Sequence, residues 1–325
     1  GPNGSIQGPA EPKWGYSILS VADWDGDGLP DIMTNGIWGK VVWYKNIGTR
    51  TAPKLAAAQP VALALPPGAP NPAPAWNWWK PKANELVSQW RTTPQMIDWN
   101  GDGLMDLVMS DHEGYLALFE RKRVAEGTLT LSSAQRVFWS EGASVFTSNG
   151  LPQNKESGLL RINDGVNGRS GRRTFCITDW DGDGRPDLMM NSAPNVNFLR
   201  GLGRDDQGRW RFRDEGPVSK HVLAGHATKP TALQRGAGAP PDLLIGAEDG
   251  FFYTVTNPRS RHARHAASTA AAVDSRSSSP LLPLPPPPAP ADAAAAAAPA
   301  AGTTDRMSSR KRLPPRAPSC SGRAQ

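Results

Sequence analysis

The chain has 325 residues, of which 33 are Gly and 32 are Pro, a composition rich in turn-forming residues that favours an all-β body over a helical one. It contains no apolar run of about 18 residues, which argues against a membrane-spanning helix. The formal net charge of +6 comes mainly from an Arg-rich C-terminal segment, so it does not make the rest of the chain a nucleic-acid partner.

Three nine-residue segments repeat one acidic pattern. They begin at Asp23, Asp98 and Asp179 and read DWDGDGLPD, DWNGDGLMD and DWDGDGRPD. Oxygen side chains at positions 1, 3, 5 and 9, with the main-chain carbonyl of position 7, can converge on one hard cation such as calcium. Gly at position 6 permits the positive φ that folds such a loop around an ion. Plain Asp-Gly hairpin turns are the alternative, but turn chemistry does not explain three copies of the same four polar positions.

The pattern predicts about three calcium ions, with ligands from each loop. These are Asp23, Asp25, Asp27, Leu29 and Asp31; Asp98, Asn100, Asp102, Leu104 and Asp106; and Asp179, Asp181, Asp183, Arg185 and Asp187. An EF-hand would add a Glu at position 12, where this chain has Thr34, Met109 and Met190. Apolar runs on both sides instead predict that each loop joins two strands. Because Asn100 replaces a carboxylate, the middle site is expected to fill last.

A β-hairpin is predicted after each loop, and the same frame occurs a fourth time. The final Asp of each copy is Asp31, Asp106, Asp187 or Asp242. The fourth copy has Gln-Arg-Gly-Ala-Gly-Ala-Pro-Pro before Asp242, so no calcium is expected there. A Trp stands at the second position of the other three loops, and this shared place predicts that Trp24, Trp99 and Trp180 are packing residues.

Two segments between the repeats are candidate ligand-binding loops. The first contains Trp76, Trp78, Trp79, Lys80 and Arg91, whose indoles could stack on sugar rings or could fill spaces between sheets. His112 and Tyr115 flank the turn of the second hairpin and are acid/base candidates, although a His near a turn is usually only a surface residue. The second segment, 148–173, is rich in amides and Arg and could recognise an acidic glycan or form a solvated hairpin.

The chain is expected to change character near residue 258. Residues 1–258 hold the repeats, whereas residues 259–325 contain no aromatic side chain and are biased to Ala, Pro and Arg, so they are predicted to be disordered. This bias would also suit a shifted reading frame or a misjoined fragment. The two cysteines, Cys176 and Cys320, lie one in each part and predict neither a disulfide nor a zinc site.

The loops with their flanking strands resemble the FG-GAP or VCBS repeat, the calcium-loop blade also found in the heads of integrin α-chains. The resemblance covers about residues 14–258. It implies an all-β, β-propeller fold and metal shells at the Asp and Asn positions already named. Successive loops are 75 and 81 residues apart, longer than the about 40 to 50 of common blades, so the segments between the repeats are candidate surface loops. Four repeats are few for a propeller of about 4 to 8 blades, and the first begins near the start of the sequence; the chain is therefore expected to be the C-terminal part of a longer propeller, with a complete four-bladed propeller as the alternative.

Function is less specified than fold, because such propellers serve in adhesion, carbohydrate binding and polysaccharide lyases alike. We expect a calcium-binding module that binds carbohydrate or mediates adhesion, with a polysaccharide or cell-surface glycan as partner and no nucleic acid partner for the folded body. A polysaccharide lyase is the alternative; it would need a cation or Arg beside a uronate carboxylate and a Tyr, His or Lys base. Calcium sites of this kind favour an extracellular or periplasmic location.

Overall fold

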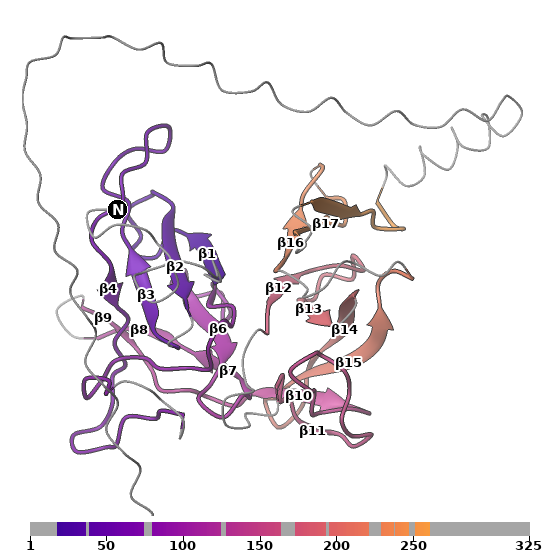
Figure 1. Ribbon diagram of the computed structural model, residues 1–325, viewed down its shortest axis with the longest axis horizontal. Helices are drawn as coiled ribbons and strands as arrows, with labels where there is room; N and C mark the ends of the chain where they lie inside the picture. The colour runs from indigo at the N-terminus through magenta and orange to yellow at the C-terminus, as the bar shows by residue number, and fades with distance from the viewer. Residues whose placement is uncertain are drawn as a thin grey trace, which may run out of the picture. The chain divides into compact units, whose positions relative to one another are not determined.

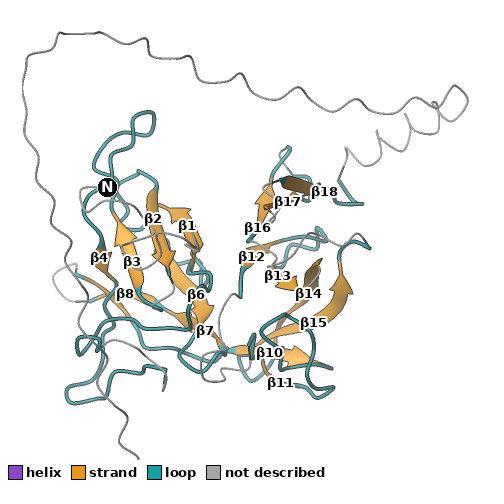
Figure 2. Cartoon of the chain, viewed as in Figure 1, coloured by secondary structure: helices purple, strands orange, loops and turns teal. Residues whose placement is uncertain are grey.

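The computed structural model describes residues 18–36, 39–74, 80–124, 128–163, 173–192, 195–220, 229–236, 238–246 and 251–260. These residues form strands and loops with no helix (Figure 2), and none of them therefore forms an apolar membrane-spanning helix. The all-β prediction is confirmed for this part of the chain. The chain divides into two compact units, Gly1–Arg276 and Ser277–Gln325, and the second unit lies outside the described residues.

The strands form four main sheets and one separate hairpin (Figure 1). The first sheet contains β1 (Ile18–Ala22), β2 (Asp31–Asn35), β3 (Val41–Tyr44) and β4 (Gln59–Pro60). The second contains β5 (Gln95–Ile97), β6 (Asp106–Ser110) and β7 (Leu116–Phe119), and β8 (Arg121–Arg123) pairs with β9 (Leu129–Leu131). The third has the order β11 (Gly158–Leu159), β10 (Phe138–Glu141), β15 (Trp210–Pro217), β14 (Asn195–Arg204), β13 (Asp187–Ser192) and β12 (Phe175–Thr178). The fourth contains β16 (Pro230–Leu233), β17 (Asp242–Gly246) and β18 (Phe252–Val255).

Each acidic loop joins two antiparallel strands, as the sequence predicts. The loops connect β1 to β2, β5 to β6 and β12 to β13, and in each pair the last Asp of the loop lies opposite the final residue of the preceding strand. The fourth repeat keeps this register, with Leu233 opposite Asp242. The predicted hairpins are also present, as β2–β3, β6–β7, β13–β14 and β17–β18.

The third sheet contains a pairing that the sequence pattern does not predict. Strand β10, from the segment between the second and third repeats, runs parallel to β15, with Phe138 opposite Trp210 and Glu141 opposite Arg213. This pairing joins residues about 70 positions apart in the chain, so no local turn signal could reveal it.

Successive sheets pack against each other through equivalent residues. Alternate side chains of a strand point to opposite faces of its sheet, so the second strand of each repeat contributes to two cores. In each repeat the second residue after the loop's last Asp packs with the loop Trp and with the following sheet. The first and third residues after that Asp point the other way and pack against the preceding sheet. The three resulting cores contain Trp24, Met33, Leu107 and Met109; Trp99, Val108, Leu188 and Met190; and Trp180, Met189, Leu243 and Ile245.

The three loop tryptophans are buried at 6 %, 9 % and 7 % exposure, which confirms their predicted packing role. The sheets are not closed into a barrel. A closed propeller and its number of blades therefore stay predictions, while the all-β fold with serially packed repeats is established.

Two residues that follow the predicted boundary at residue 258 contact the folded body. The guanidinium of Arg259 donates a hydrogen bond to the main-chain oxygen of Asp181 at 2.8 Å, and Ser260 is buried at 1 % exposure. Composition could not place these two residues in the body, because Arg and Ser are ordinary components of the segment that follows.

Candidate metal centres

The first Asp of each loop organises the loop backbone. In the first loop, Asp23 Oδ1 accepts hydrogen bonds from the N–H groups of Gly26 (2.8 Å) and Asp27 (3.1 Å), and its Oδ2 accepts from Gly28 (2.8 Å). Asp98 and Asp179 make the same three bonds within their own loops, at 2.8 to 3.1 Å. The glycines at position 6 have φ values of 86°, 85° and 84°, which confirms the predicted left-handed turn.

The last Asp of each loop is fully buried and connects three segments. Asp31 Oδ2 accepts from the N–H of Trp24 at 3.1 Å, and its Oδ1 accepts from the N–H of Asn46 at 2.7 Å. Asp106 accepts the same two bonds from the N–H groups of Trp99 and Arg121, and Asp187 accepts them from those of Trp180 and Gly201. Burial raises the pKa of these carboxyls above the usual range, and that of Asp187 to about 6. A bound cation would favour their charged form.

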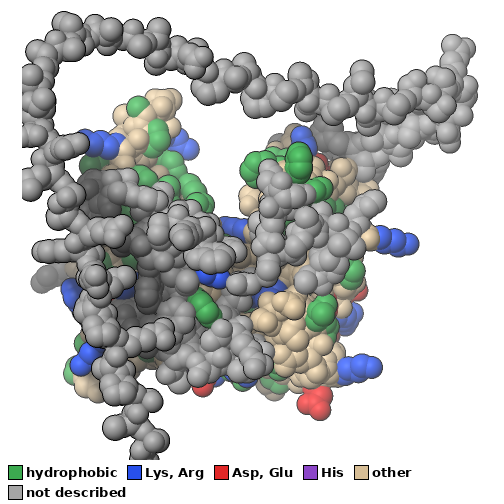
Figure 3. Space-filling view, in the orientation of Figure 1, with side chains coloured by type: hydrophobic (Ala, Val, Ile, Leu, Met, Phe, Trp, Pro, Cys, Tyr) green, Lys and Arg blue, Asp and Glu red, His purple; other side chains and the backbone are tan. Residues whose placement is uncertain are grey.

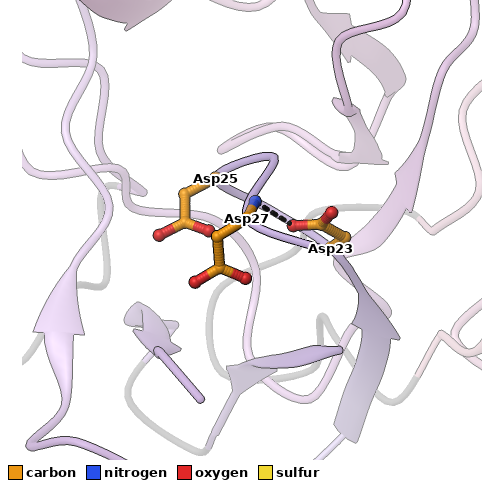
Figure 4. Close-up of side chains that lie close together, drawn as sticks. All are labelled: Asp23, Asp25 and Asp27. Carbon is orange, nitrogen blue, oxygen red and sulfur yellow. Dashed lines mark hydrogen bonds between the residues drawn. The ribbon is translucent and has the colours of Figure 1, made fainter. Parts of the chain in front are cut away.

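Two groups of carboxylates are arranged so that they could hold a metal ion. Asp23, Asp25 and Asp27 each offer an oxygen within 4.8 Å of the others, and so do Asp179, Asp181 and Asp187. Figure 4 shows the first group, with Asp25 and Asp27 projecting to the same side of the loop and a hydrogen bond from the Asp27 main chain to Asp23. The middle loop, where Asn100 stands at position 3, forms no such group among the residues that the structure describes.

The donor set fits calcium. It consists of carboxylate and carbonyl oxygens, which are the ligands of hard divalent cations. Asp25 Oδ1 is buried and has no hydrogen-bond partner, so a cation there would satisfy an oxygen whose desolvation is otherwise uncompensated. The side chains in the first loop that would hold the ion are therefore Asp23, Asp25 and Asp27.

Basic side chains lie against the first and third groups. Lys45 Nζ contacts Asp25 and lies 2.7 Å from Asp27 Oδ2. Arg200 Nε lies 2.7 Å from Asp181 Oδ2, and its Nη2 is 3.4 Å from Asp183. Spacing within the nine-residue motif could not reveal these cations. Alignment of the repeats gives no signal either, because Lys45 stands 14 residues after Asp31 whereas Arg200 stands 13 residues after Asp187, inside β14.

The fourth repeat replaces the loop by an ion pair. Arg235 Nε lies 3.0 Å from Asp242 Oδ2, the oxygen that in the other repeats accepts a bond from the loop Trp. Asp242 Oδ1 keeps its usual partner, the N–H of Asn257, at 2.8 Å. In this repeat the Arg235 side chain thus takes the place of the Trp main-chain N–H as the partner of the last Asp.

The structure describes only part of the candidate ligand-binding residues between the repeats. Trp76, Trp78 and Trp79 lie outside the described residues, and Lys80 is exposed. Arg91 is buried at 6 % exposure with a positive φ of 56°, which leaves little of its side chain for an external ligand.

Two guanidinium groups lie close to the ring of Tyr115. The Arg136 and Arg161 groups are 4.1 Å and 5.1 Å from the centre of its ring. Arg136 also pairs with Asp111 at 2.6 Å and with Glu113. His112 contributes its main-chain oxygen, which accepts a bond from Gln89 at 2.7 Å. Most of the Arg-rich segment between Arg161 and Arg173 lies outside the described residues.

Cys176 is a free, buried thiol, and burial raises its pKa to about 12. It packs with Trp180 and Met189 in the core between the third and fourth sheets, so its role there is that of a small apolar side chain. A search of known protein families finds no match to this chain, and no curated protein sequence matches it.

Proposed function

We propose that this chain is a calcium-stabilised repeat module of the β-propeller type that binds carbohydrate or mediates adhesion outside the cytoplasm. The observation that carries the calcium part is the common loop structure. Three loops use the same backbone bonds to present their carboxylates, and Asp25 has a buried oxygen without a partner. An extracellular or periplasmic setting follows from the proposal, because abundant calcium there can fill sites of moderate affinity.

Chelation tests the calcium assignment. An ion that binds only the folded state stabilises it by about 2.7 kcal/mol at a hundred times its dissociation constant. The melting temperature of the body should therefore rise with added calcium and fall in excess chelator, and the magnesium salt at equal ionic strength is the control. A melt that does not respond to calcium would remove the basis of the proposal.

The described surface that best fits an acidic glycan is the outer face of β10 and β15. Trp139 lies opposite Arg211 in the parallel pair, and the guanidinium of Arg209 is 4.1 Å from its ring centre. Arg211 and Arg213 are 40 % and 53 % exposed and share one carboxylate, Glu141. Two cations on one anion leave net positive charge beside an indole, which suits a carboxylated or sulfated sugar. Lys and Arg side chains are also more evident than Asp and Glu on the face seen in Figure 3.

A polysaccharide lyase is the second candidate, and one observation favours it. Tyr115 with Arg136 and Arg161 combines a proton acceptor with groups that could neutralise a uronate. A substrate would have to compete with Asp111 and Glu113 for Arg136. Incubation with pectic, ulvan-like or gum polysaccharides should produce the ultraviolet absorbance of an unsaturated uronate if the lyase assignment holds. Binding of the same polymers without that absorbance would favour the carbohydrate-binding module over the lyase.

A further inference from the structure

We infer that the Asn100–Gly101 pair of the middle acidic loop is a site of spontaneous deamidation, a covalent modification that converts Asn100 to an acidic residue. The inference does not rest on the proposed calcium or carbohydrate binding. Asn-Gly pairs favour this reaction, because Gly has no Cβ to shield its main-chain nitrogen from the preceding side-chain amide. The chain contains five such pairs, and those at Asn35, Asn100 and Asn149 lie in the described residues.

Two of these three pairs are protected by their surroundings. Asn35 is fully buried, and its side-chain amide donates to the main-chain oxygen of Gln89 at 3.0 Å. Asn149 is exposed, but the Gly150 that follows it is buried. The N–H of Gly150 donates to the main-chain oxygen of Thr147 at 2.9 Å, and a Cβ added to Gly150 would collide with neighbouring main chain. The crowded peptide at Gly150 is therefore held away from the Asn149 amide.

The pair at Asn100 has neither protection. The Asn100 side chain is exposed, and a Cβ added to Gly101 would meet no other described atom within 4 Å. The N–H of Asp102 donates to Asn100 Oδ1 at 2.9 Å. Because this bond spans Gly101, it folds the side-chain amide back over the Gly101 peptide, and the same donor can stabilise negative charge that develops on Oδ1. The N–H of Gly101 donates to Asp98 Oδ1 at 2.8 Å, so a carboxylate lies where it can accept the proton.

The reaction needs no partner other than water. The Gly101 nitrogen forms a bond to Asn100 Cγ and gives its proton to Asp98. The bond between Cγ and Nδ2 then breaks, and Nδ2 takes up that proton and leaves as ammonia. Water opens the resulting cyclic imide and returns a proton to the Gly101 nitrogen. Opening at Cγ gives Asp, and opening at the main-chain carbonyl gives isoaspartate. One water is consumed and one ammonia is released in either case.

The modification changes the charge of the middle loop. The Asn100 amide donates to Asp102 Oδ2 at 3.1 Å, and its nitrogen lies 3.5 Å from Glu120 Oε1. Deamidation replaces this donor by a carboxylate, so like charges then face one another. The Asp product has the same four acidic positions as the first and third loops, whereas the isoaspartate product lengthens the loop backbone. Because ammonia is lost, the change runs in one direction.

Ageing of the whole protein tests the inference. The protein is incubated at mildly alkaline pH without added divalent cation and digested, and the peptides that contain Asn35, Asn100 and Asn149 are followed by mass spectrometry. We expect the Asn100 peptide to exchange its amide for an acid at least about tenfold faster than the other two. Asp and isoaspartate should both appear, because water opens the imide at either carbonyl. Equal rates at Asn100 and Asn149, or the formation of Asp alone by direct hydrolysis, would overturn the inference.

The same ageing in denaturing urea separates the effect of the fold from that of the sequence. The unfolded chain removes the different surroundings of the three pairs, so their rates should converge. A tenfold preference for Asn100 that persists in urea would come from neighbouring residues in the sequence and would contradict the structural argument. Asn100→Gln is the matched control, because Gln forms the corresponding larger ring less readily. It should remove the reaction at this position and leave the rate at Asn149 unchanged, and an unchanged urea midpoint shows that the variant is folded.

Discussion

The side-chain amide of Asn257 donates a hydrogen bond to the main-chain oxygen of Trp180 at 2.7 Å, across the interface between the fourth and third repeats. The same amide donates to Pro241 at 3.0 Å. Arg121 holds an equivalent place in the second repeat, where its guanidinium donates to the main-chain oxygen of Trp24 in the first. The residue after one hairpin thus anchors the loop Trp of the preceding repeat.

Loss of this anchor should weaken the body. Asn257 is buried, so Asn257→Ala leaves the oxygens of Trp180 and Pro241 without this donor and should lower the free energy of unfolding by about 1 to 3 kcal/mol. Urea denaturation measures this change. Asn149→Ala removes an exposed amide and should stay within about 0.5 kcal/mol of the parent protein. Equal effects of the two substitutions would show that the anchor is not important for stability.

The lowered pKa of Lys229 should be visible in the way the free energy of unfolding varies with pH. Burial lowers the pKa of Lys229 from 10.5 to about 8, and its ammonium donates to the main-chain oxygen of Leu19 at 2.6 Å. Between these two values the unfolded lysine binds more protons than the folded one, so Lys229 makes the free energy of unfolding rise with pH, and the net rise should be seen from about pH 8 to 9. Above about pH 9 the buried thiol of Cys176, whose pKa is raised from 9.0 to about 12, makes the opposite contribution. Lys229→Met should flatten the rise with pH, whereas Lys54→Met should not.

The end of the folded body should lie after residue 260. Removal of residues 261–325 is expected to leave the cooperative melt unchanged, because that segment lacks the apolar side chains that would offset ordering entropy. Removal of residues 259–325 also deletes the Arg259 bond to Asp181 and should cost about 1 kcal/mol more. Identical melts for the two truncations would place the boundary at 258 after all.

The Trp-rich segment offers a test that separates glycan binding from packing. If Trp78 and Trp79 stack on sugars, replacing both by Ala should weaken glycan binding and leave the melt nearly unchanged. If they are buried, each replacement should cost about 3 to 5 kcal/mol of stability. A thermal melt and a binding assay on one double variant therefore distinguish the two roles.

If the outer face of β10 and β15 binds the glycan instead, the polysaccharide-binding assay should respond to substitutions on that face. Arg211→Gln with Arg213→Gln removes both exposed cations while Glu141 stays in place. Binding of an acidic polysaccharide should fall at least about tenfold and become less sensitive to salt, while a neutral polysaccharide should bind as before. Equal loss of both polymers would point to a surface other than this one.

The sequence by itself determined the local structure of the repeats. Loop glycines, alternating apolar residues and the recurring Trp are short-range signals, and they correctly predict the strands joined by each loop, the hairpins and the buried indoles. The loop carboxylates were predicted from the same spacing, since a metal loop of nine residues is a local object.

Only the tertiary structure decided which side chains from outside the loops face them. The loop motif contains no information about Lys45 or Arg200, because these residues reach the carboxylates only after the hairpin folds back and the last Asp bonds the following N–H. The parallel pairing of β10 with β15 and the anchoring of Trp180 by Asn257 likewise join distant segments. Such contacts depend on how whole sheets pack, and neither periodicity nor spacing along one strand specifies that packing.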